Sequence, residues 1–328
     1  MINLIHMIYK YDRKTVEFKL TKLRGTETAE YYRVIYPSPE VSPFAENNLV
    51  YGLYIKPKSV TSTAIICLQG FRVERDDPWK NTGYYFAKHG LASLSIVLPY
   101  HRARTPKGFP PSEAFLSVNP DQQLRNFEQA VADVRRGIDL LEQLGYKRFH
   151  IWGKSLGAMV GIIAHALDTR INRGVYIGVG GNFGRIVWHG MGLSDFRHAH
   201  MVRGVTRHRC YQTRKNYWRF MESVASLSSP QQIDEIKVDG QYCINLPKKV
   251  NAPSECYYAD PITFCPFIRS ENVLIIKGLI DPVIPLWSTL EMLRYLPHAR
   301  VIWLPFGHVS IGLIRSHILR WSVSFFTM

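Results

Sequence analysis

The strongest constraint on the fold is an alternation of short apolar runs with helical segments between about residues 50 and 180. Runs that are apolar at every position are typical of strands buried on both faces, and apolar residues at steps of three and four indicate helices. Strands are expected at about residues 50–55, 64–68, 91–98, 148–152 and 174–179, and helices at about 80–89, 121–144 and 156–167. Strands that alternate with helices predict an α/β protein with a mostly parallel central sheet, covered by helices on both faces.

The alternation stops after Gly180 and resumes near residue 269. The segment between mixes aromatic residues, charges and prolines without a repeating pattern, as an inserted cap would. Beyond it we expect strands at about 272–277 and 300–304, and helices at about 286–296 and from 309, while Lys10 to Pro43 supplies edge strands. The predicted division is a core of residues 1–180 and 269–328 with an inserted cap at residues 181–268. A chain of 328 residues with 46% apolar residues has enough material for one large core.

Ser155 stands in the middle of the sequence Gly153-Lys154-Ser155-Leu156-Gly157, between an expected strand and an expected helix. In this context the pattern G-x-S-x-G is typical of a sharp turn that presents the serine hydroxyl at the carboxyl end of a sheet. The helix that follows offers backbone N–H groups to a developing oxyanion. The alternative is a glycine-containing turn with an incidental serine, and the flanking pattern favours the nucleophile.

A serine hydroxyl is a weak nucleophile until a base removes its proton, and that base needs a partner that orients it. Asp281 follows the strand expected at 272–277, and His308 follows the strand expected at 300–304. Both therefore lie past the carboxyl ends of strands, on the edge where Ser155 is expected and where open α/β sheets bind ligands. The sequence predicts a Ser155, Asp281 and His308 triad in this chain order.

These motifs resemble the α/β-hydrolase fold family, of the serine esterase and lipase type, over roughly residues 50 to 328 without the cap. In that family His-Gly usually follows the third strand, where this chain has Leu68-Gln69-Gly70-Phe71. The resemblance implies that the backbone N–H groups of Leu156 and Phe71 form the oxyanion hole. Glutamine in place of histidine does not remove such a hole, because the backbone donates.

A second resemblance comes from Pro99-Tyr100-His101, which follows the expected strand at 91–98, together with Asp260-Pro261. The pair is similar to a subgroup of hydrolase-domain proteins with no firmly assigned substrate. It therefore supports the fold and leaves the reaction open. Candidate pocket-lining residues are Gln69, Tyr100, His101 and Lys154.

Other residues compete for these roles. His298 and His317 are alternative bases, but the first is expected on the amino side of the sheet and the second inside the last helix; Asp260 is an alternative acid, whose following proline fits a helix cap equally well. Gly178 to Gly184 does not match G-x-G-x-x-G, because Phe183 stands where glycine is needed, so no dinucleotide is expected. His198-Ala199-His200 lacks an obvious carboxylate partner, so no metal is expected either.

The chain has 41 Lys and Arg against 26 Asp and Glu, a net charge of +15. Seven of the cations, and no acid, lie in the segment 196–221, which also contains the aromatic residues Tyr211, Tyr217, Trp218 and Phe220. This segment could track phosphates, contact an anionic membrane, or cover an acidic substrate; the alternative is an exposed basic face with its aromatics packed inward. We expect a small ester substrate, acidic in character, with peripheral contact to anionic membranes as a further partner and no nucleic acid.

Five cysteines without a paired spacing are expected to be reduced thiols, and the apolar N-terminus lacks the basic region and cleavage site of a signal peptide. Both features predict a cytoplasmic protein. Its predicted function is that of a serine hydrolase that cleaves carboxylic esters through an acyl-enzyme on Ser155. The alternatives are an acyltransferase or thioesterase with the same triad, or a catalytically silent binding protein with this fold.

Overall fold

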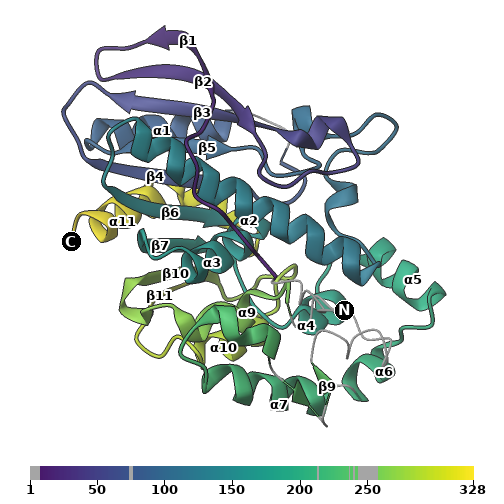
Figure 1. The fold of residues 1–328 in the computed structure, drawn as a ribbon. Coiled ribbons are helices and arrows are strands. Elements are labelled where there is room, and N and C mark those ends of the chain that lie inside the picture. Colours follow the sequence, from purple (N-terminus) through teal and green to yellow (C-terminus); the bar gives the residue numbers. More distant parts are fainter. Residues whose placement is uncertain (1–7, 74–76, 213, 236, 239–240, 243–257) are drawn as a thin grey trace.

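The computed structural model describes residues 8–73, 77–212, 214–235, 237–238, 241–242 and 258–328. A sheet of nine strands runs through the molecule in the order β1-β2-β3-β5-β4-β6-β7-β10-β11 (Figure 1). The strands are β1 Lys19–Gly25, β2 Ala29–Pro37, β3 Leu49–Pro57, β4 Thr63–Leu68, β5 Ala92–Ile96, β6 Arg148–Lys154, β7 Ile171–Ile177, β10 Val273–Gly278 and β11 Arg300–Leu304. The six strands from β5 to β11 in this order are mutually parallel, and β1 to β3 form an antiparallel edge.

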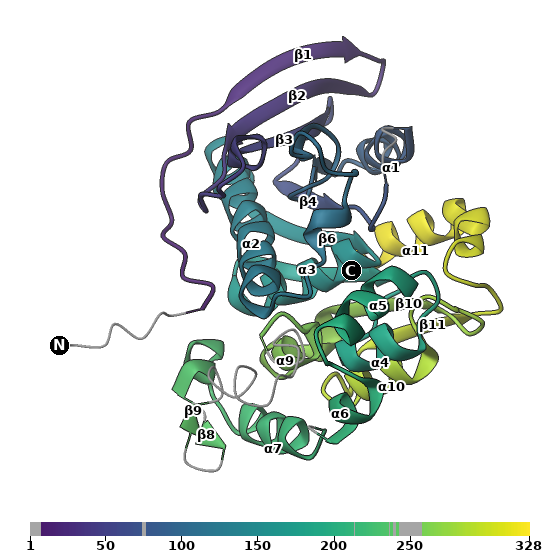
Figure 2. The same ribbon diagram turned by 90° about the vertical axis from the view of Figure 1, so that its right-hand side faces the viewer.

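Helices cover both faces of the sheet (Figure 2). On one face lie α2 (Pro120–Gln143), α3 (Leu156–Leu167) and α9 (Pro261–Phe264), and on the other lie α1 (Asp77–Lys88) and α11 (Arg315–Thr327). The parallel strands β4 and β5 are buried at every position, whereas β2 alternates between buried and more exposed residues. This difference follows from the layers, because helices cover both faces of the parallel strands and the antiparallel edge keeps one face partly in water.

The predicted α/β-hydrolase fold class is therefore confirmed, with differences at some element ends. β7 begins at Ile171 rather than 174, because Asn172 and Arg173 interrupt the apolar run that indicated the strand. α10 (Leu286–Leu293) ends before 296, and a 3-10 turn precedes α11. The 3-10 segments are Ala45–Asn48, Arg102–Arg104, Glu113–Phe115, Pro230–Glu235, Cys265–Phe267, Ser270–Asn272 and Ser310–Ile314.

The described part of residues 181–268 contains the short helices α4 (Phe183–His189), α5 (Ser194–Val202), α6 (Arg207–Gln212) and α7 (Arg214–Ala225). A small hairpin joins β8 (Lys237–Val238) to β9 (Gln241–Tyr242). Figure 1 places these elements together, away from β1 and β2. Tyr258, Ile262 and Phe264 are buried in the same apolar cluster as α2 and α3, and so are Ile186 on α4 and Phe220 on α7. The division into core and cap stays a prediction.

No helix in the described parts of the chain is both long and apolar enough to cross a membrane. Cys67, Cys210 and Cys265 are free thiols, and Cys243, Cys256 and the first seven residues of the apolar N-terminus lie outside the described residues.

Candidate active site

Ser155 occupies a strained turn between β6 and α3. Its φ of 53° and ψ of −120° are rare for a residue with a side chain, and its backbone N–H donates to the Ile177 carbonyl over 2.8 Å. A Cβ at Gly153 would lie 2.7 Å from Ala158 Cα, and one at Gly157 would lie 2.3 Å from the Gln69 carbonyl oxygen. Both glycines of the motif are therefore needed for the close approach of α3 to β6 and to the loop after β4.

The side chains of Ser155, His308 and Asp281 form a hydrogen-bonded chain. His308 Nε2 lies 2.9 Å from Ser155 Oγ, and His308 Nδ1 lies 2.8 Å from Asp281 Oδ2. Because an ionised carboxylate only accepts hydrogen bonds, Nδ1 carries the proton in this arrangement and Nε2 is free to accept from the serine hydroxyl. The structure thus brings together three residues that lie up to 153 positions apart in the sequence.

Asp281 is held by more than His308. Its Oδ1 accepts hydrogen bonds from the backbone N–H groups of Val283 and Ile284, both at 2.9 Å, and its Oδ2 lies 2.8 Å from Lys277 Nζ. Burial by itself would raise the pKa of Asp281, but the hydrogen bonds and charges of His308 and Lys277 outweigh it and lower that pKa below its ordinary value. Asp281 is therefore kept ionised beside the imidazole.

Lys277 was not among the residues singled out in the sequence. It lies in β10, and its side chain is completely buried between Asp281 and the carbonyl oxygen of Ile284, 2.5 Å from Nζ. Burial lowers the pKa of Lys277. The sequence does contain a signal for the role of Lys277: it is a lysine in an otherwise apolar strand, four residues before the expected acid Asp281.

Gly178 also contributes to the site, in a role unrelated to a dinucleotide. It follows β7 with a φ of +59°, and a Cβ there would lie 3.2 Å from His308 Cε1. The glycine therefore leaves the space that the imidazole ring occupies.

The two expected oxyanion donors, Leu156 and Phe71, belong to segments that adjoin Ser155. Leu156 begins α3, so its N–H belongs to the first turn and has no carbonyl partner within the helix. A Cβ at Gly70 would lie 3.4 Å from Ser155 Cβ, so the loop that carries Phe71 passes next to the serine. Their role in stabilising an oxyanion stays a prediction.

The four candidate pocket residues fall in different surroundings. Gln69 lines a cavity of about 580 Å³, and Lys154 lines another of about 280 Å³ together with Gly70 and Arg315. Tyr100 is buried, and its N–H donates to Asn47 Oδ1 over 2.8 Å. His101 is buried against Phe71, with ring centroids 6.2 Å apart, and burial lowers its pKa to about 4. A single pocket shared by these four residues stays a prediction.

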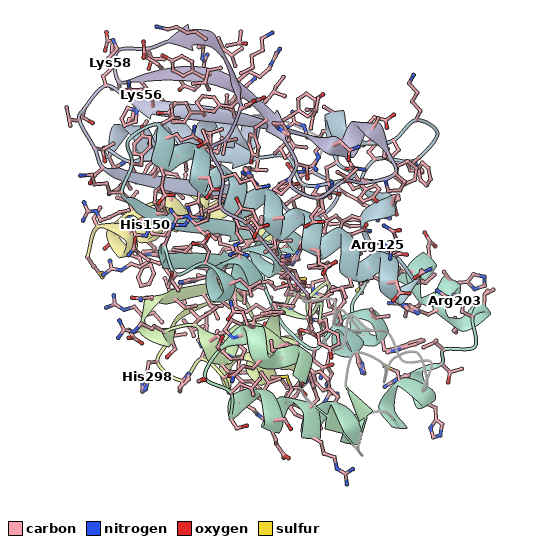
Figure 3. The ribbon with its side chains drawn as sticks, viewed as in Figure 1. Lys56, Lys58, Arg125, His150, Arg203 and His298 are labelled. Carbon is pink, nitrogen blue, oxygen red and sulfur yellow. The ribbon has the colours of Figure 1, made fainter. Side chains whose placement is uncertain are left out.

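The rival residues lie elsewhere. His298 is exposed at the edge where His150, at the start of β6, also lies, opposite the side that carries Arg203 (Figure 3). His317 is exposed on α11. Asp260 caps α9, and its carboxylate also accepts hydrogen bonds from the backbone N–H groups of Asn182 and Phe183. It therefore joins α9 to the start of α4 and has no contact with His308.

The His198-Ala199-His200 motif shows no metal-binding arrangement. His198 is exposed, whereas His200 is buried on α5 with its ring 4.6 Å from that of Phe196. Within the described ranges, no group of three or more histidine, cysteine or acidic side chains could hold a metal ion.

Two arginines of the basic segment 196–221 form hydrogen bonds with backbone carbonyls outside the segment. Arg197 Nη1 donates to the carbonyls of Val187 and Gly190, and Arg203 Nη1 donates to that of Val118. The aromatic residues Tyr217 and Phe220 on α7 are buried. These two rings are therefore not available as a stacking platform for bases.

Comparison with protein-family models finds no match, and neither does comparison with curated proteins. Among solved structures, the fold is similar to an acetyl xylan esterase from Paenibacillus sp. R4, with a TM-score of 0.61 and 18% identity over 94% of this chain and 88% of that chain. It is also similar to a cold-adapted esterase from an Arctic intertidal metagenomic library, with a TM-score of 0.55 and 13% identity over 94% and 97% of the two chains. A third similar structure is MGS-M2, an alpha/beta hydrolase enzyme from a Medee basin deep-sea metagenome library, with a TM-score of 0.50 and 19% identity over 85% and 94%.

The sheet order, the helices on both faces and these similarities define the class of the protein: it has the α/β-hydrolase fold, resembling that of esterases. At this level of identity the similarity concerns the fold, and the reaction has to be argued from the site.

Proposed function

We propose that this protein is a serine hydrolase that cleaves carboxylic esters through an acyl-enzyme on Ser155. The observation that carries the proposal is the hydrogen-bonded chain from Ser155 Oγ through both nitrogens of His308 to Asp281. A nucleophile within reach of a base that is itself oriented by a third group is the arrangement that activates a serine. The esterase titles of two similar structures are consistent with it.

In the proposed mechanism, Ser155 Oγ attacks the acyl carbonyl carbon while its proton passes to His308 Nε2. The imidazolium is stabilised by the ionised Asp281, and it then protonates the leaving alcohol oxygen as the carbon–oxygen bond of the ester breaks. Water attacks the acyl-enzyme in the same way: its proton goes to His308, the acid product leaves, and Ser155 recovers its proton. The N–H groups of Leu156 and Phe71 would stabilise the negative oxygen in both steps.

Acetyl and other short-chain esters are the substrates to test first, because one similar structure is titled an acetyl xylan esterase. We also propose that acidic esters are preferred, since the chain carries +15 and the basic segment 196–221 belongs to the proposed cap. Contact with an anionic membrane remains a further proposal on the same charge. For its location we propose the cytosol, with the free thiols of the described chain as support.

The test is a comparison of the wild-type protein with Ser155→Ala. The wild-type protein should hydrolyse short-chain p-nitrophenyl esters and react with a fluorophosphonate probe, and the variant should do neither. Ser112→Ala is a matched control, because Ser112 also has a positive φ of 69° and does not belong to the hydrogen-bonded chain of Ser155, His308 and Asp281. Labelling that is unchanged in Ser155→Ala would overturn the assignment of the nucleophile.

Two outcomes separate the alternatives. If no ester is cleaved and no probe reacts although the protein is folded, the chain is a binding protein with this fold. If an added alcohol or a CoA thioester is consumed faster than simple esters are hydrolysed, the same acyl-enzyme serves acyl transfer or thioester cleavage.

A further inference from the structure

A second cavity, of about 580 Å³, lies on the α1 face of the sheet. Its floor is formed by β2, β3 and β5 where these strands pair: Arg33 lies opposite Leu53, and Leu53 lies opposite Ser95. α1 and the 3-10 segment Arg102–Arg104 supply the sides. The lining described for this cavity contains none of Ser155, Asp281 and His308.

Three cations from distant parts of the chain line this cavity. Arg33 comes from β2, Lys80 from α1 and Arg102 from the loop after β5, and no acidic side chain of the described residues joins them in the lining. In the part of the chain that the structure describes, neither Arg33 nor Lys80 has a hydrogen-bond or ion-pair partner. Like charges around one cavity repel each other, and an anion between them would remove that repulsion.

The remaining lining provides both an apolar wall and a buried amide. The apolar part is made mainly of strand residues: Leu23, Ile35, Tyr51, Leu53, Ile96 and Val97. Gln69 lines the cavity from the loop after β4; its residue is 1% exposed, and its Nε2 has no hydrogen-bond partner within the described chain. A buried amide without a partner is costly, and an acceptor on a ligand could satisfy it.

We propose that this cavity binds a small organic molecule that carries a phosphate group. A phosphate monoester has about −1.5 to −2 charges at pH 7, which matches the two positive charges of Arg33 and Lys80 better than a single carboxylate does. The guanidinium group of Arg33 suits phosphate oxygens, and the apolar strand residues accommodate the organic part. The volume lies in the range of about 300 to 1,000 Å³ that is typical of small-molecule sites.

This site is independent of the proposed esterase function, although the two are neighbours in the chain. Gln69 precedes Gly70 and Phe71, the loop that passes next to Ser155. A ligand in the cavity would therefore touch Gln69, the residue that precedes this loop. Ligand binding and ester hydrolysis are measured separately. Absence of esterase activity would therefore not contradict the proposal for the cavity, and absence of binding would not contradict the proposed esterase function.

The test is isothermal titration calorimetry of the full chain with phenyl phosphate, inorganic phosphate and benzoate. We expect phenyl phosphate to bind with a Kd of about 1 mM or below, more tightly than either of the other two. Arg33→Gln with Lys80→Gln should weaken it by about tenfold or more. Gln69→Leu should weaken it by a few fold while leaving the thermal unfolding midpoint unchanged or higher, because it removes an unpaired buried amide.

The control is Lys56→Gln, which removes one positive charge from β3 on the opposite face, since Lys56 is an odd number of residues from Leu53. Figure 3 shows Lys56 and Lys58 at the edge of the sheet away from Arg125 and Arg203. The control should change the Kd by less than about twofold. If Lys56→Gln weakens the binding of phenyl phosphate as much as the double variant does, the proposed site is wrong. If inorganic phosphate binds as tightly as phenyl phosphate, the proposal that the ligand has an organic part is wrong.

Discussion

The ammonium group of Lys277 lies 2.8 Å from Oδ2 of Asp281, the same carboxylate oxygen that lies 2.8 Å from His308 Nδ1. The side chains of Lys277 and Asp281 are 0% and 1% exposed. A carboxylate buried this deeply needs a compensating charge, and His308 supplies one only when it is protonated. Lys277 therefore keeps Asp281 ionised while the imidazole is still neutral.

Lys277→Met tests this role. The substitution keeps most of the side-chain volume but leaves the carboxylate of Asp281 buried without the ammonium group that lies 2.8 Å from it. The free energy of unfolding should fall by about 3 to 5 kcal/mol, and the pKa of Asp281 should rise. Urea denaturation at pH 7 measures the first effect. Lys56→Met, at an exposed position, should change the stability by less than about 0.5 kcal/mol; an equally small effect of Lys277→Met would contradict this role.

The lowered pKa of Asp281 also gives its contribution to stability a pH window. Because its pKa is lower in the folded protein than in the unfolded chain, the stabilisation is fully present above the unfolded value of about 3.9 and is lost as the pH falls through the folded value. In Asp281→Asn this contribution should be absent. Urea denaturation from pH 6 down to pH 3 should therefore show a smaller loss of stability in the variant than in the wild-type protein. If the free energy of unfolding depends on pH in the same way in both proteins, the pKa of Asp281 is not lowered in the folded state.

Asp260 should have the opposite pH dependence. Burial raises its pKa to about 7, with a further contribution from Glu291, although three backbone N–H groups oppose the shift. Between about pH 4 and 7 the folded protein then binds more protons at this site than the unfolded chain, so stability falls as the pH rises. From pH 5 to 8, the free energy of unfolding should fall by about 2 kcal/mol more in the wild-type protein than in Asp260→Asn. Chemical denaturation at both pH values measures this difference.

Gly178→Ala should impair the proposed chemistry through His308. The new methyl group would lie 3.2 Å from His308 Cε1, so the imidazole has to shift, and we expect a loss of about 10- to 100-fold in kcat/KM for p-nitrophenyl acetate. Gly145→Ala is the control, because Gly145 also has a positive φ, +95°, but no other atom within 4 Å of the new Cβ. Both variants carry backbone strain, so equal activities would show that contact with the histidine is unimportant.

Salt should reduce the hydrolysis of acidic esters more than that of neutral ones. Arg207 and Arg219 in the basic segment are exposed, and their attraction for an anionic substrate is screened over about 8 to 10 Å at physiological ionic strength. We therefore expect kcat/KM for a carboxylated ester to fall between about 20 and 500 mM NaCl, while that for the matching neutral ester changes little. If salt changes kcat/KM equally for both esters, the basic segment does not attract acidic substrates, and its positive charge serves only solubility.

The sequence by itself determined the class of fold and the three residues of the proposed triad. Short apolar runs such as residues 64–68 are typical of strands covered on both faces, and the carboxyl ends of parallel strands share one edge. Residues just beyond β6, β10 and β11 therefore meet, whatever their separation in the chain. Local pattern was sufficient here because chain order and strand direction together fix the edge.

The tertiary structure decided what surrounds these residues. In the sequence Lys277 is one polar residue in an apolar strand, and only the fold shows that it pairs with Asp281. Arg33, Lys80 and Arg102 belong to different elements, and they line one cavity because β2, α1 and the loop after β5 pack together. Strand periodicity states which face a side chain occupies, but not which distant group will lie opposite it. That choice depends on how the layers pack, and it determines which charged side chains acquire a partner, as Lys277 does with Asp281.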